Sequence, residues 1–551
     1  MSKTKKKIVT NFAMQATILA AASIISKLIG MIYNIPLANM LGPIGNGYYG
    51  RAQTIYSFIL LIATFSIPAA VSKIMAEYIE KGQYKNVKRI FNVAMLYVLV
   101  VGGIAALFTY FAAPMLVTEN TVTALRVLAP TVFISGFLSV YRGYFQSYGN
   151  MVPTSVSQII EQIFNAIFSI VAAVLFINIA VSAGKNQDIY GAAGGTLGTG
   201  IGAVAGFIYI FILFAAGKKD LNKKISSDTS EKTLSYGEVL RLLLTIATPI
   251  ILSAAIYNIN VPLDMNIHDK VLGYLGVDSD IIDGQYGLYS RYYLVLANVP
   301  IAMAAAIASA VIPGISSAHA VGNIKECNRK ITQSMQLTMT LTAPCAFGFA
   351  VLGRQIVSLV YYKLDVTDNK TVAYLLLFGG FSIIVYGISS VLNGVLQGIG
   401  KVNVPVISSL TALVLHIFVL VPMLFLGFGT YSLIAATALY AIIVVFMNYH
   451  TVKKELGYRM KWKTIVGVPL LASAIMGMAT FFIYHILEML LDLIAGEFTS
   501  NTMATLLSIA IAAIIYFISI IKVGGYTEEM LLSFPKGTLL VKIAKKLHLI
   551  K

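Results

Sequence analysis

Five ionisable side chains lie inside segments that are otherwise strongly apolar, and they are the residues best placed to do chemistry. They are Lys27, Arg51, Glu161, Asp264 and Arg291. A charge at the centre of a bilayer costs at least about 2.5–3.5 kcal/mol on insertion scales, so it is tolerated only beside water or a partner. Three of the five are cations, and a basic pocket in lipid favours an anionic ligand such as a phosphate group. The sequence therefore predicts a site that binds an anion.

Uncharged polar residues accompany these charges, which suggests a polar cavity between four apolar segments. We predict that Lys27, Arg51, Arg291, Asn34, Asn258 and Asn260 bind the substrate, and that Glu161 and Asp264 are candidate ion-coupling residues. Structural alternatives stay open. Arg51 and Arg291 lie near segment ends and could reach the outer interface. Glu161 could be the partner of a nearby cation or amide, and Asp264 could cap a loop.

Motifs for bond-breaking chemistry are absent from the sequence. It contains no Walker lysine loop, no HExxH motif and no nucleophile elbow. The two cysteines, Cys327 and Cys345, have no metal-ligand spacing, and a disulfide between them is not expected. We therefore predict a protein that is not an enzyme and uses no metal or cofactor. An ion gradient or the membrane potential would supply the energy.

The composition indicates a membrane protein. Of the 551 residues, 58% are hydrophobic and 11% are charged, whereas soluble proteins carry about 25% charged residues. The mean hydropathy is +0.81. The net charge of +17 sits in short loops between apolar segments, so membrane topology explains it better than nucleic-acid binding does.

An apolar length of about 20 residues is enough to cross a bilayer, and fourteen segments reach it. We place these spans at 12–40, 46–76, 86–116, 122–147, 152–180, 189–216, 238–264, 285–318, 327–353, 371–398, 402–427, 430–452, 463–491 and 500–522. The fold class is thus an all-α polytopic membrane protein.

Positive charge alternates from loop to loop along these spans. Most of the 40 Lys and Arg residues fall in every second loop, which we assign to the cytosol. The predicted outer loops are acidic instead, with Asp278, Asp280 and Asp283 as examples. We expect a bacterial cytoplasmic membrane protein with both termini in the cytosol.

Two pairs of short motifs indicate an internal repeat. Gly82 to Arg89 resembles Gly322 to Arg329, and Arg142 to Gly149 resembles Asn393 to Gly400. Their order is the same on both sides of a hydrophilic stretch. Each half holds an even number of spans, so we expect two six-helix lobes in parallel orientation. The chance recurrence of such motifs is the alternative.

The repeat divides the chain into five parts. They are an N-lobe (1–216), a cytosolic linker (217–237), a C-lobe (238–455), two further spans (456–523) and an amphipathic tail (524–551). In the tail, Leu539, Leu540, Ile543 and Leu547 share one face, and Lys542, Lys545 and Lys546 share another. We expect this tail to lie on the inner leaflet.

Three motifs resemble one branch of the polysaccharide exporters, represented by stage V sporulation protein B and YtgP-like proteins. They are Ser26 to Pro36 (SKLIGMIYNIP), Gly42 to Gly45 (GPIG) and Ile67 to Lys73 (IPAAVSK). More distantly, the chain is similar to MurJ-type lipid II flippases, and both groups belong to the MOP superfamily. The resemblance implies two six-helix lobes around a V-shaped cavity and an undecaprenyl-pyrophosphate-linked glycan moved by alternating access.

The resemblance carries over to few residues. Lys27 after Ser26 keeps the charge of an arginine in the MurJ pattern, whereas Tyr33 and Asn34 stand where that family has an Arg-Asp pair. Arg291 matches a further arginine only approximately. The resemblance also implies that the last two spans form a groove for the lipid tail.

We therefore expect a flippase, active as a monomer, whose partners are a lipid-linked glycan, possibly lipid II, and membrane lipids. Two rival functions remain at this stage. One is a cation-coupled drug exporter of the same superfamily, and the other is a non-transporting scaffold in envelope or spore assembly.

Overall fold

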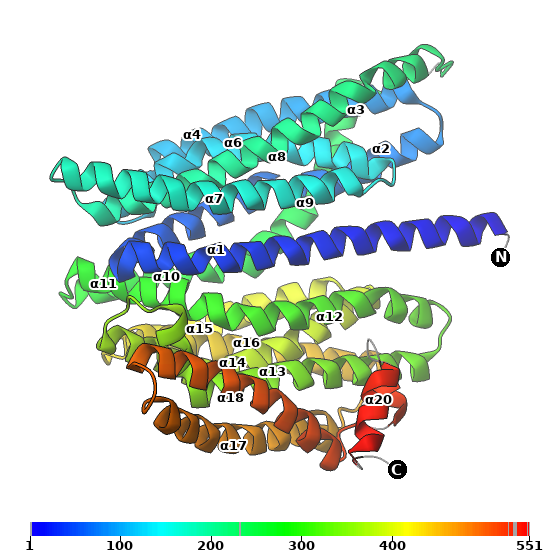
Figure 1. Cartoon of the computed structure of the whole chain (residues 1–551). Coiled ribbons are helices and arrows are strands. Elements are labelled where there is room, and N and C mark those ends of the chain that lie inside the picture. Colours follow the sequence, from blue (N-terminus) through cyan, green and yellow to red (C-terminus); the bar gives the residue numbers. More distant parts are fainter. Residues whose placement is uncertain are drawn as a thin grey trace. The chain divides into compact units, whose positions relative to one another are not determined.

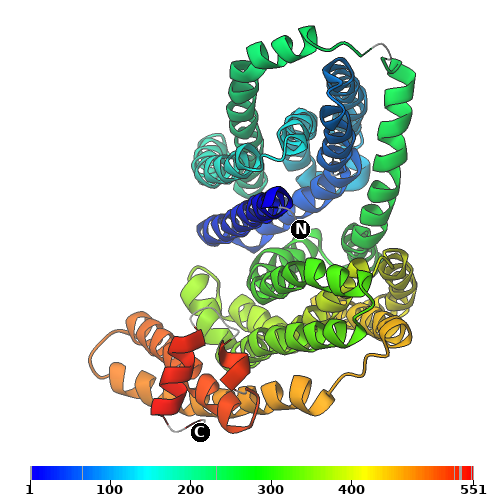
Figure 2. The same cartoon turned by 90° about the vertical axis from the view of Figure 1, so that its right-hand side faces the viewer.

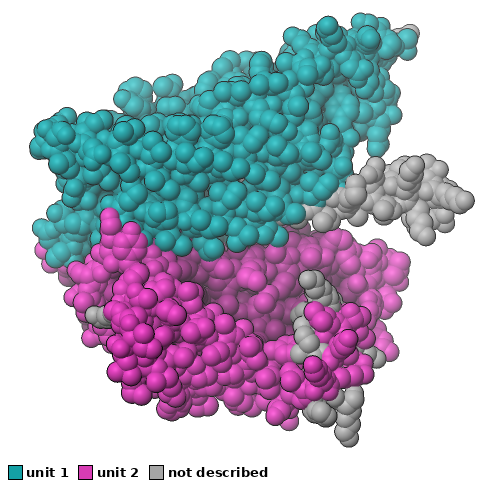
Figure 3. Space-filling view, in the orientation of Figure 1, with its two compact units in different colours: residues 1–266, 278–287 teal, residues 267–277, 288–551 magenta. Residues whose placement is uncertain are grey.

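A computed structural model describes residues 3–64, 66–230, 233–526, 528–532, 537–547 and 549. These residues form helices joined by short turns, and none of them lies in a strand (Figure 1). The chain divides into two compact units, coloured separately in Figure 3. Unit 1 comprises residues 1–266 and 278–287, and unit 2 comprises residues 267–277 and 288–551.

The helices of unit 1 run through the first half of the chain. They are α1 (Lys3–Thr64), α2 (Ile67–Glu80), α3 (Tyr84–Tyr97), the π-helical turn η1 (Val98–Gly102), α4 (Gly103–Phe111), α5 (Ala113–Leu116), the 3-10 turn η2 (Glu119–Thr121), α6 (Val122–Ser147), α7 (Val152–Ser182), α8 (Gln187–Ser226), α9 (Tyr236–Asn258) and α11 (Ser279–Gly287). Helix α10 (Asn260–Tyr274) begins in unit 1 and ends in unit 2.

The remaining helices belong to unit 2. They are the π-helical turn η3 (Leu288–Tyr293), α12 (Leu294–Ala320), α13 (Ile324–Val360), α14 (Val366–Gly398), α15 (Asn403–Phe425), α16 (Thr430–Leu456), the π-helical turn η4 (Lys463–Gly467), α17 (Val468–Leu491), α18 (Glu497–Lys522), α19 (Glu528–Leu532) and α20 (Gly537–Lys546).

Among the described residues, thirteen helices are long and apolar enough to cross a membrane. The first of them covers 60 residues, Ala21–Glu80, and includes Gly42, whose backbone is not helical (φ 65°, ψ 176°). A 60-residue helix would be about 90 Å long, three times the thickness of a hydrocarbon core. Division at Gly42 gives two spans in its place, which agrees with the predicted fourteen.

The repeated motifs have the same backbone conformation in both halves. Gly82 and Gly322 both have φ 70°, and Gly149 and Gly400 have φ 70° and 78°. Each glycine ends a helix in the left-handed region, which only glycine enters without strain. The matching turns also form matching hydrogen bonds, such as Gly82 N–H to Ile79 O and Gly322 N–H to His319 O. These shared turns support an internal repeat.

Helices α7 and α8 form the most extensive helix–helix contact in unit 1 (Figure 1). Three glycines one turn apart on α8 face the backbone of α7. A Cβ at Gly194 would lie 2.4 Å from Ala172 O, and one at Gly198 would lie 2.2 Å from Ser169 N. At Gly202 it would lie 2.4 Å from Glu161 O. Small residues at this spacing let membrane helices approach closely, and here they fix the polar face of α7.

The hydrophilic stretch after α8 differs in part from the predicted linker. Helix α8 continues to Ser226, ten residues past the predicted span end at 216. The segment that follows contacts the start of α3: Lys85 N–H donates to Asp228 Oδ2 (2.7 Å), and Leu234 N–H donates to Asn86 Oδ1 (2.8 Å). Ser235 and Glu238 then form a capping box that begins α9.

Helix α9 packs within unit 1 on α2 and α3, where Val239, Leu243 and Ala247 join their apolar core. The predicted C-lobe begins at residue 238 and would include almost all of α9. The compact units and the predicted lobes divide the chain by different criteria, so the predicted domain boundaries stay a prediction.

In unit 2, the C-terminal helix α20 lies near the ends of α17 and α18 (Figure 2). Val541 and Ala544 are buried in one apolar cluster with residues of both helices, including Val468 and Ile520. Of the predicted apolar face, Leu539 and Leu547 are exposed, and the side chains of Leu540 and Ile543 lie outside the described residues. Val541 and Ala544 thus face the protein, and the expected contact of the tail with the inner leaflet stays a prediction.

Candidate functional site

Arg51 on α1 forms a buried ion pair with Asp283 on α11. Arg51 Nη1 lies 2.6 Å from Asp283 Oδ1, and both side chains are almost fully buried. Arg51 Nη2 also donates to Ile282 O (3.3 Å), and the guanidinium lies 4.6 Å from the centre of the Tyr286 ring. The cation is thus paired, hydrogen-bonded and stacked on an aromatic face, which offsets the cost of burying it.

Close backbone contact between the two helices makes this ion pair possible. A Cβ at Gly47 would lie 2.0 Å from Asp283 O, and a Cβ at Gly287 would lie 2.0 Å from Pro43 O. Asn46 secures the adjacent break at Gly42 by donating to Ala38 O (2.8 Å) and Gly42 O (2.7 Å). Larger residues at these glycines would push the helices apart and separate the charges.

This geometry corrects two expectations from the sequence. Arg51 was predicted to face a polar cavity as a substrate-binding cation, but it is 0% exposed and occupied by Asp283. Asp283 was placed among the acidic residues of an outer loop, but it is 1% exposed and lies in a helix. The Arg51 charge is therefore neutralised by Asp283 and is not offered to an anionic ligand.

Glu161 on α7 pairs with Arg142 on α6. Arg142 Nη2 lies 2.7 Å from Glu161 Oε2, and Arg142 Nε donates to Ser157 Oγ (3.0 Å). Both charged side chains are only partly exposed. The structure therefore shows the alternative in which Glu161 partners a nearby cation, and a coupling role for Glu161 stays a proposal.

One turn further along α7, a polar cluster extends from Asn165. Asn165 Nδ2 donates to Tyr33 Oη (3.2 Å), and Ser169 Oγ donates to Asn165 Oδ1 (2.9 Å). Thr199 Oγ1 contacts the same oxygen and also accepts from Gln53 Nε2 (3.1 Å). The sequence prediction missed Asn165. Its signal was the spacing of Glu161, Asn165 and Ser169 at successive turns of one helix face.

The other predicted residues of unit 1 lie on α1, α9 and α10. Lys27 is exposed on α1, and Asn34 and Asn260 are partly buried. Asn258 Nδ2 donates to Ala254 O within α9 (2.8 Å). Asp264 is 8% exposed on α10, so it is more buried than a loop cap would be.

Arg291 belongs to unit 2, where it lies in the π-helical turn η3 and is partly buried. Tyr361 Oη donates toward the carbonyl oxygens of Arg291 (3.5 Å) and Tyr292 (3.4 Å). The rings of Tyr292 and Tyr361 meet edge to face at 4.7 Å. Such π turns often occur at functional sites, and these contacts fix the backbone that presents Arg291.

An apolar cavity of about 570 Å³ lies within unit 2, between α13, α17 and α18. Its wall on α13 extends from Thr340 to Ile356 at helical spacing, and Met476 of α17 and Phe517 of α18 line the other sides. From Thr340 to Ile356, sixteen steps along α13 correspond to about 24 Å of helix. Among the described residues, no group of His, Cys, Asp and Glu could hold a metal ion. The residues that line the cavity are mostly apolar, and none of them is charged.

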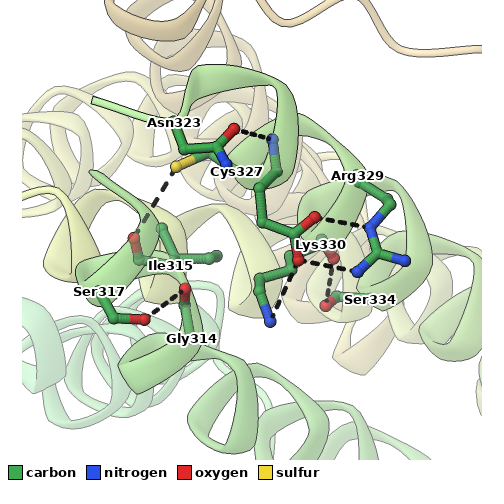
Figure 4. A network of polar contacts seen from close by, with 9 residues as sticks. Gly314, Ile315, Ser317, Asn323, Cys327, Arg329, Lys330 and Ser334 are labelled. Atoms are coloured by element: carbon green, nitrogen blue, oxygen red, sulfur yellow. Dashed lines mark hydrogen bonds and ion pairs between the residues drawn. The ribbon is translucent and has the colours of Figure 1, made fainter. Parts of the chain in front are cut away.

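One side of unit 2 carries a polar network at the start of α13 (Figure 4). Asn323 Oδ1 caps the helix by accepting from Glu326 N–H (3.0 Å), and Glu326 pairs with Arg329 (2.7 Å). The Cys327 thiol is buried and donates to Ile315 O (3.8 Å). This cysteine is thus part of the packing between α12 and α13.

Family models match most of the chain. The model described as polysaccharide biosynthesis protein matches residues 12–319, and the MatE model matches residues 293–422. The chain is 27% identical to the lipid II flippase MurJ of Bacillus subtilis (strain 168) over 503 residues, which is 87% of this chain and 90% of MurJ. It is 24% identical to stage V sporulation protein B of the same organism over 457 residues, covering 81% and 84%.

Solved structures share the fold. The lipid II flippase MurJ in an inward closed conformation has a TM-score of 0.64 at 18% identity, covering 91% of this chain and 97% of that structure. An inward-facing multidrug resistance MATE family transporter of the MOP superfamily has a TM-score of 0.60 at 14% identity, covering 82% and 95%. At these identities, the likeness shows the helical fold alone.

Proposed function

Since this chain belongs to the polysaccharide biosynthesis protein family of the MOP superfamily, we propose that it is a flippase for a lipid-linked glycan. The substrate would be an undecaprenyl-pyrophosphate-linked sugar, with lipid II as one candidate. It would move from the inner to the outer leaflet by alternating access. The protein would act as a monomer in the bacterial cytoplasmic membrane, with both termini in the cytosol.

The apolar cavity between α13, α17 and α18 carries this proposal. A lipid-linked glycan has a hydrocarbon tail that must stay out of water while its headgroup crosses, and an apolar slot about 24 Å long fits that requirement. The cavity uses α17 and α18, the two helices beyond the twelve of the repeat. A drug exporter of the same superfamily has no such tail to accommodate, so the cavity favours the flippase.

The headgroup requires cations, and two of the three predicted ones remain candidates. Lys27 is exposed on α1, and Arg291 is partly buried on a rigid turn. We propose that both bind the pyrophosphate, because Lys supplies a point charge and Arg a planar fork for phosphate oxygens. Asn34, Asn258 and Asn260 would contact the sugar. Transport would be driven by a proton or cation that binds Asp264 or Glu161, or by the membrane potential.

Growth of a bacterial strain depleted of its own flippase tests the proposal. Lys27→Ala and Arg291→Ala should abolish complementation at normal expression, and Lys185→Ala, an exposed cation in a predicted outer loop, should complement fully. Native mass spectrometry of the purified protein should detect a bound polyprenyl-pyrophosphate species. Full growth of both the Lys27→Ala and the Arg291→Ala strain would refute the proposed headgroup site. Drug resistance without complementation would identify an exporter. The absence of both drug resistance and complementation would identify a scaffold.

A further inference from the structure

The last part of α8, residues 217–226, extends past the predicted end of its membrane span. It contains four lysines and one acidic residue. One side of this extension is packed against the protein: Leu221 is buried, and Leu221 and Ile225 belong to the apolar cluster that also includes Tyr84. The extension is therefore held within unit 1, and its other side has a defined position.

That other side forms an open groove of about 610 Å³. The residues that line the groove are exposed, and none of them is acidic or apolar: they are Lys219, Asn222, Lys223, Ser226 and Ser227. The first four recur at spacings of three and four residues, which places them on one face of the helix. The groove thus presents only cationic and neutral polar groups.

The acidic residue of the extension does not neutralise the groove. Asp220 Oδ2 lies 3.2 Å from Lys224 Nζ, and Lys224 also lies 5.7 Å from the ring centres of Tyr84 and Tyr148. Asp220 and Lys224 are therefore paired with each other beside the packed side of the helix. Neither of them lines the groove.

The hydroxyl groups of the groove are used by the helix itself. Ser226 Oγ donates to Asn222 O (3.0 Å), and Ser227 Oγ donates to Lys223 O (3.0 Å). The donors that remain for a ligand are the Asn222 amide and the ammonium groups of Lys219 and Lys223. Among the described residues, neither ammonium group has an ion-pair partner.

The charge balance of the groove favours an anion. The end of a helix carries about half a negative charge, which opposes an anionic ligand and attracts lysines. Lys219 and Lys223 together contribute two positive charges, so the groove remains positive. Their Cβ atoms are about 5–6 Å apart, as for any pair one turn apart on a helix. Two ammonium groups at this spacing can both reach the oxygens of one phosphate group.

We propose that this groove binds a phosphate group through Lys219, Lys223 and the amide of Asn222. Two sources carry this chemistry, namely the headgroup of an anionic membrane lipid and inorganic phosphate. A lysine-rich stretch just past the end of a membrane span is well placed for lipid headgroups. The site does not depend on the proposed flippase function, and its ligand would be additional to a transported substrate.

The experiment measures the binding of both probes to the purified protein in detergent. Native mass spectrometry measures retained phosphatidylglycerol, with phosphatidylcholine as the neutral reference, and equilibrium dialysis measures inorganic phosphate. Lys219→Gln and Lys223→Gln should each weaken binding about fivefold, and the double variant about twenty-five-fold, which is the usual contribution of a lysine near an anionic surface. Glutamine preserves helix propensity, so the unfolding midpoint should not change.

Lys218→Gln is the matched control, because it removes one exposed charge from the same helix end but does not line the groove. It should leave binding almost unchanged. Weakened binding of phosphatidylglycerol in the groove variants would identify a lipid headgroup as the source, and weakened binding of inorganic phosphate would identify the free ion.

Two results would overturn the proposal. The first is that the double variant binds both probes as the parent does, including the case in which neither protein binds either probe. The second is an equal loss of binding in Lys218→Gln and Lys223→Gln, which would show that only the total charge of the helix end matters.

Discussion

Arg51 and Asp283 form the most completely buried ion pair that the structure shows within unit 1, with 2.6 Å between Nη1 and Oδ1 and exposures of 0% and 1%. The two residues lie far apart in the chain, and each stands one turn from a glycine that touches the opposite helix. Removing one partner of a buried pair leaves an uncompensated charge, which typically costs about 3–5 kcal/mol. The pair therefore determines whether α11 stays on α1.

The first prediction concerns this pair. Asp283→Asn and Arg51→Gln should each lower the free energy of unfolding by about 3–5 kcal/mol, because each leaves its partner buried without an opposite charge. The measurement is the thermal unfolding midpoint of the purified protein in detergent. Asp280→Asn, an exposed change on the same helix, should have almost no effect.

A double replacement sharpens this test. Combining Arg51→Gln with Asp283→Asn should cost less than the sum of the two single changes, because no buried charge then remains. Additive losses would show that the two side chains act independently, contrary to the geometry.

The second prediction concerns the contact between α7 and α8. Gly198→Ala places a Cβ 2.2 Å from backbone and side-chain atoms of Ser169, which cannot move without separating the helices. Overpacking of this kind costs about 1–3 kcal/mol. Gly217→Ala lies on the same helix with open space around it, so it should gain up to about 1 kcal/mol from helix propensity. Opposite shifts of the unfolding midpoint are therefore expected for the same substitution. A gain of similar size at both positions would show that helix propensity, and not packing against Ser169, decides the effect at Gly198.

Particular residues show how far the sequence could predict this structure. The fourteen spans followed from apolar length, and the turns at Gly82 and Gly322 followed from a repeated motif, because both signals are local. The stripe of Gly194, Gly198 and Gly202 was also visible, since glycine at every fourth position is a packing signal. Local pattern therefore accounts for the helices and for one of their contacts.

The candidate site was harder to predict, because it depends on distances between remote residues. Arg51 was recognised as a charge in an apolar segment, but nothing local indicates that Asp283 neutralises it. Asp283 itself looked like one of several acids near a loop. No single residue marked the cavity beside Cys345, since a cavity exists where side chains of three helices leave space unfilled. Only the family resemblance implied a groove at the last two spans.

The third prediction addresses Glu161. In its ion pair with Arg142, the Arg142 side chain is 14% exposed and the Glu161 side chain is 25% exposed. Breaking this pair should therefore cost less stability than breaking the buried pair of Arg51 and Asp283. If Glu161 serves only as a partner, Glu161→Gln and Arg142→Gln should impair complementation equally, and the double variant should be no worse than either. If Glu161 carries a coupling ion, Glu161→Gln should abolish transport even when Arg142 is also neutral. Measuring complementation and unfolding midpoints for all three variants distinguishes the two roles.

The last prediction concerns the segment that joins α8 to α9. Burial alone would raise the pKa of Asp228, but hydrogen bonds from the N–H groups of Lys85 and Ser230 lower it below its ordinary value. The carboxylate is therefore charged at neutral pH and caps the start of α3. A group whose pKa is lower in the folded state stabilises the fold above its unfolded-state pKa, about 3.9, and this contribution is lost as the pH falls through the folded-state pKa.

Hydrogen exchange of the Lys85 amide tests this contact, because that amide is the donor to Asp228. In the parent protein, protection should be equal at pH 7 and pH 5 after correction for intrinsic exchange. Asp228→Ala should expose the amide and reduce its protection at both values, whereas Asp220→Ala, an exposed acid on α8, should not. Because Asn86 follows Lys85 in the first turn of α3, loss of the cap should also speed exchange at Asn86. Unchanged protection at Lys85 in Asp228→Ala would show that the segment does not hold α3 in solution.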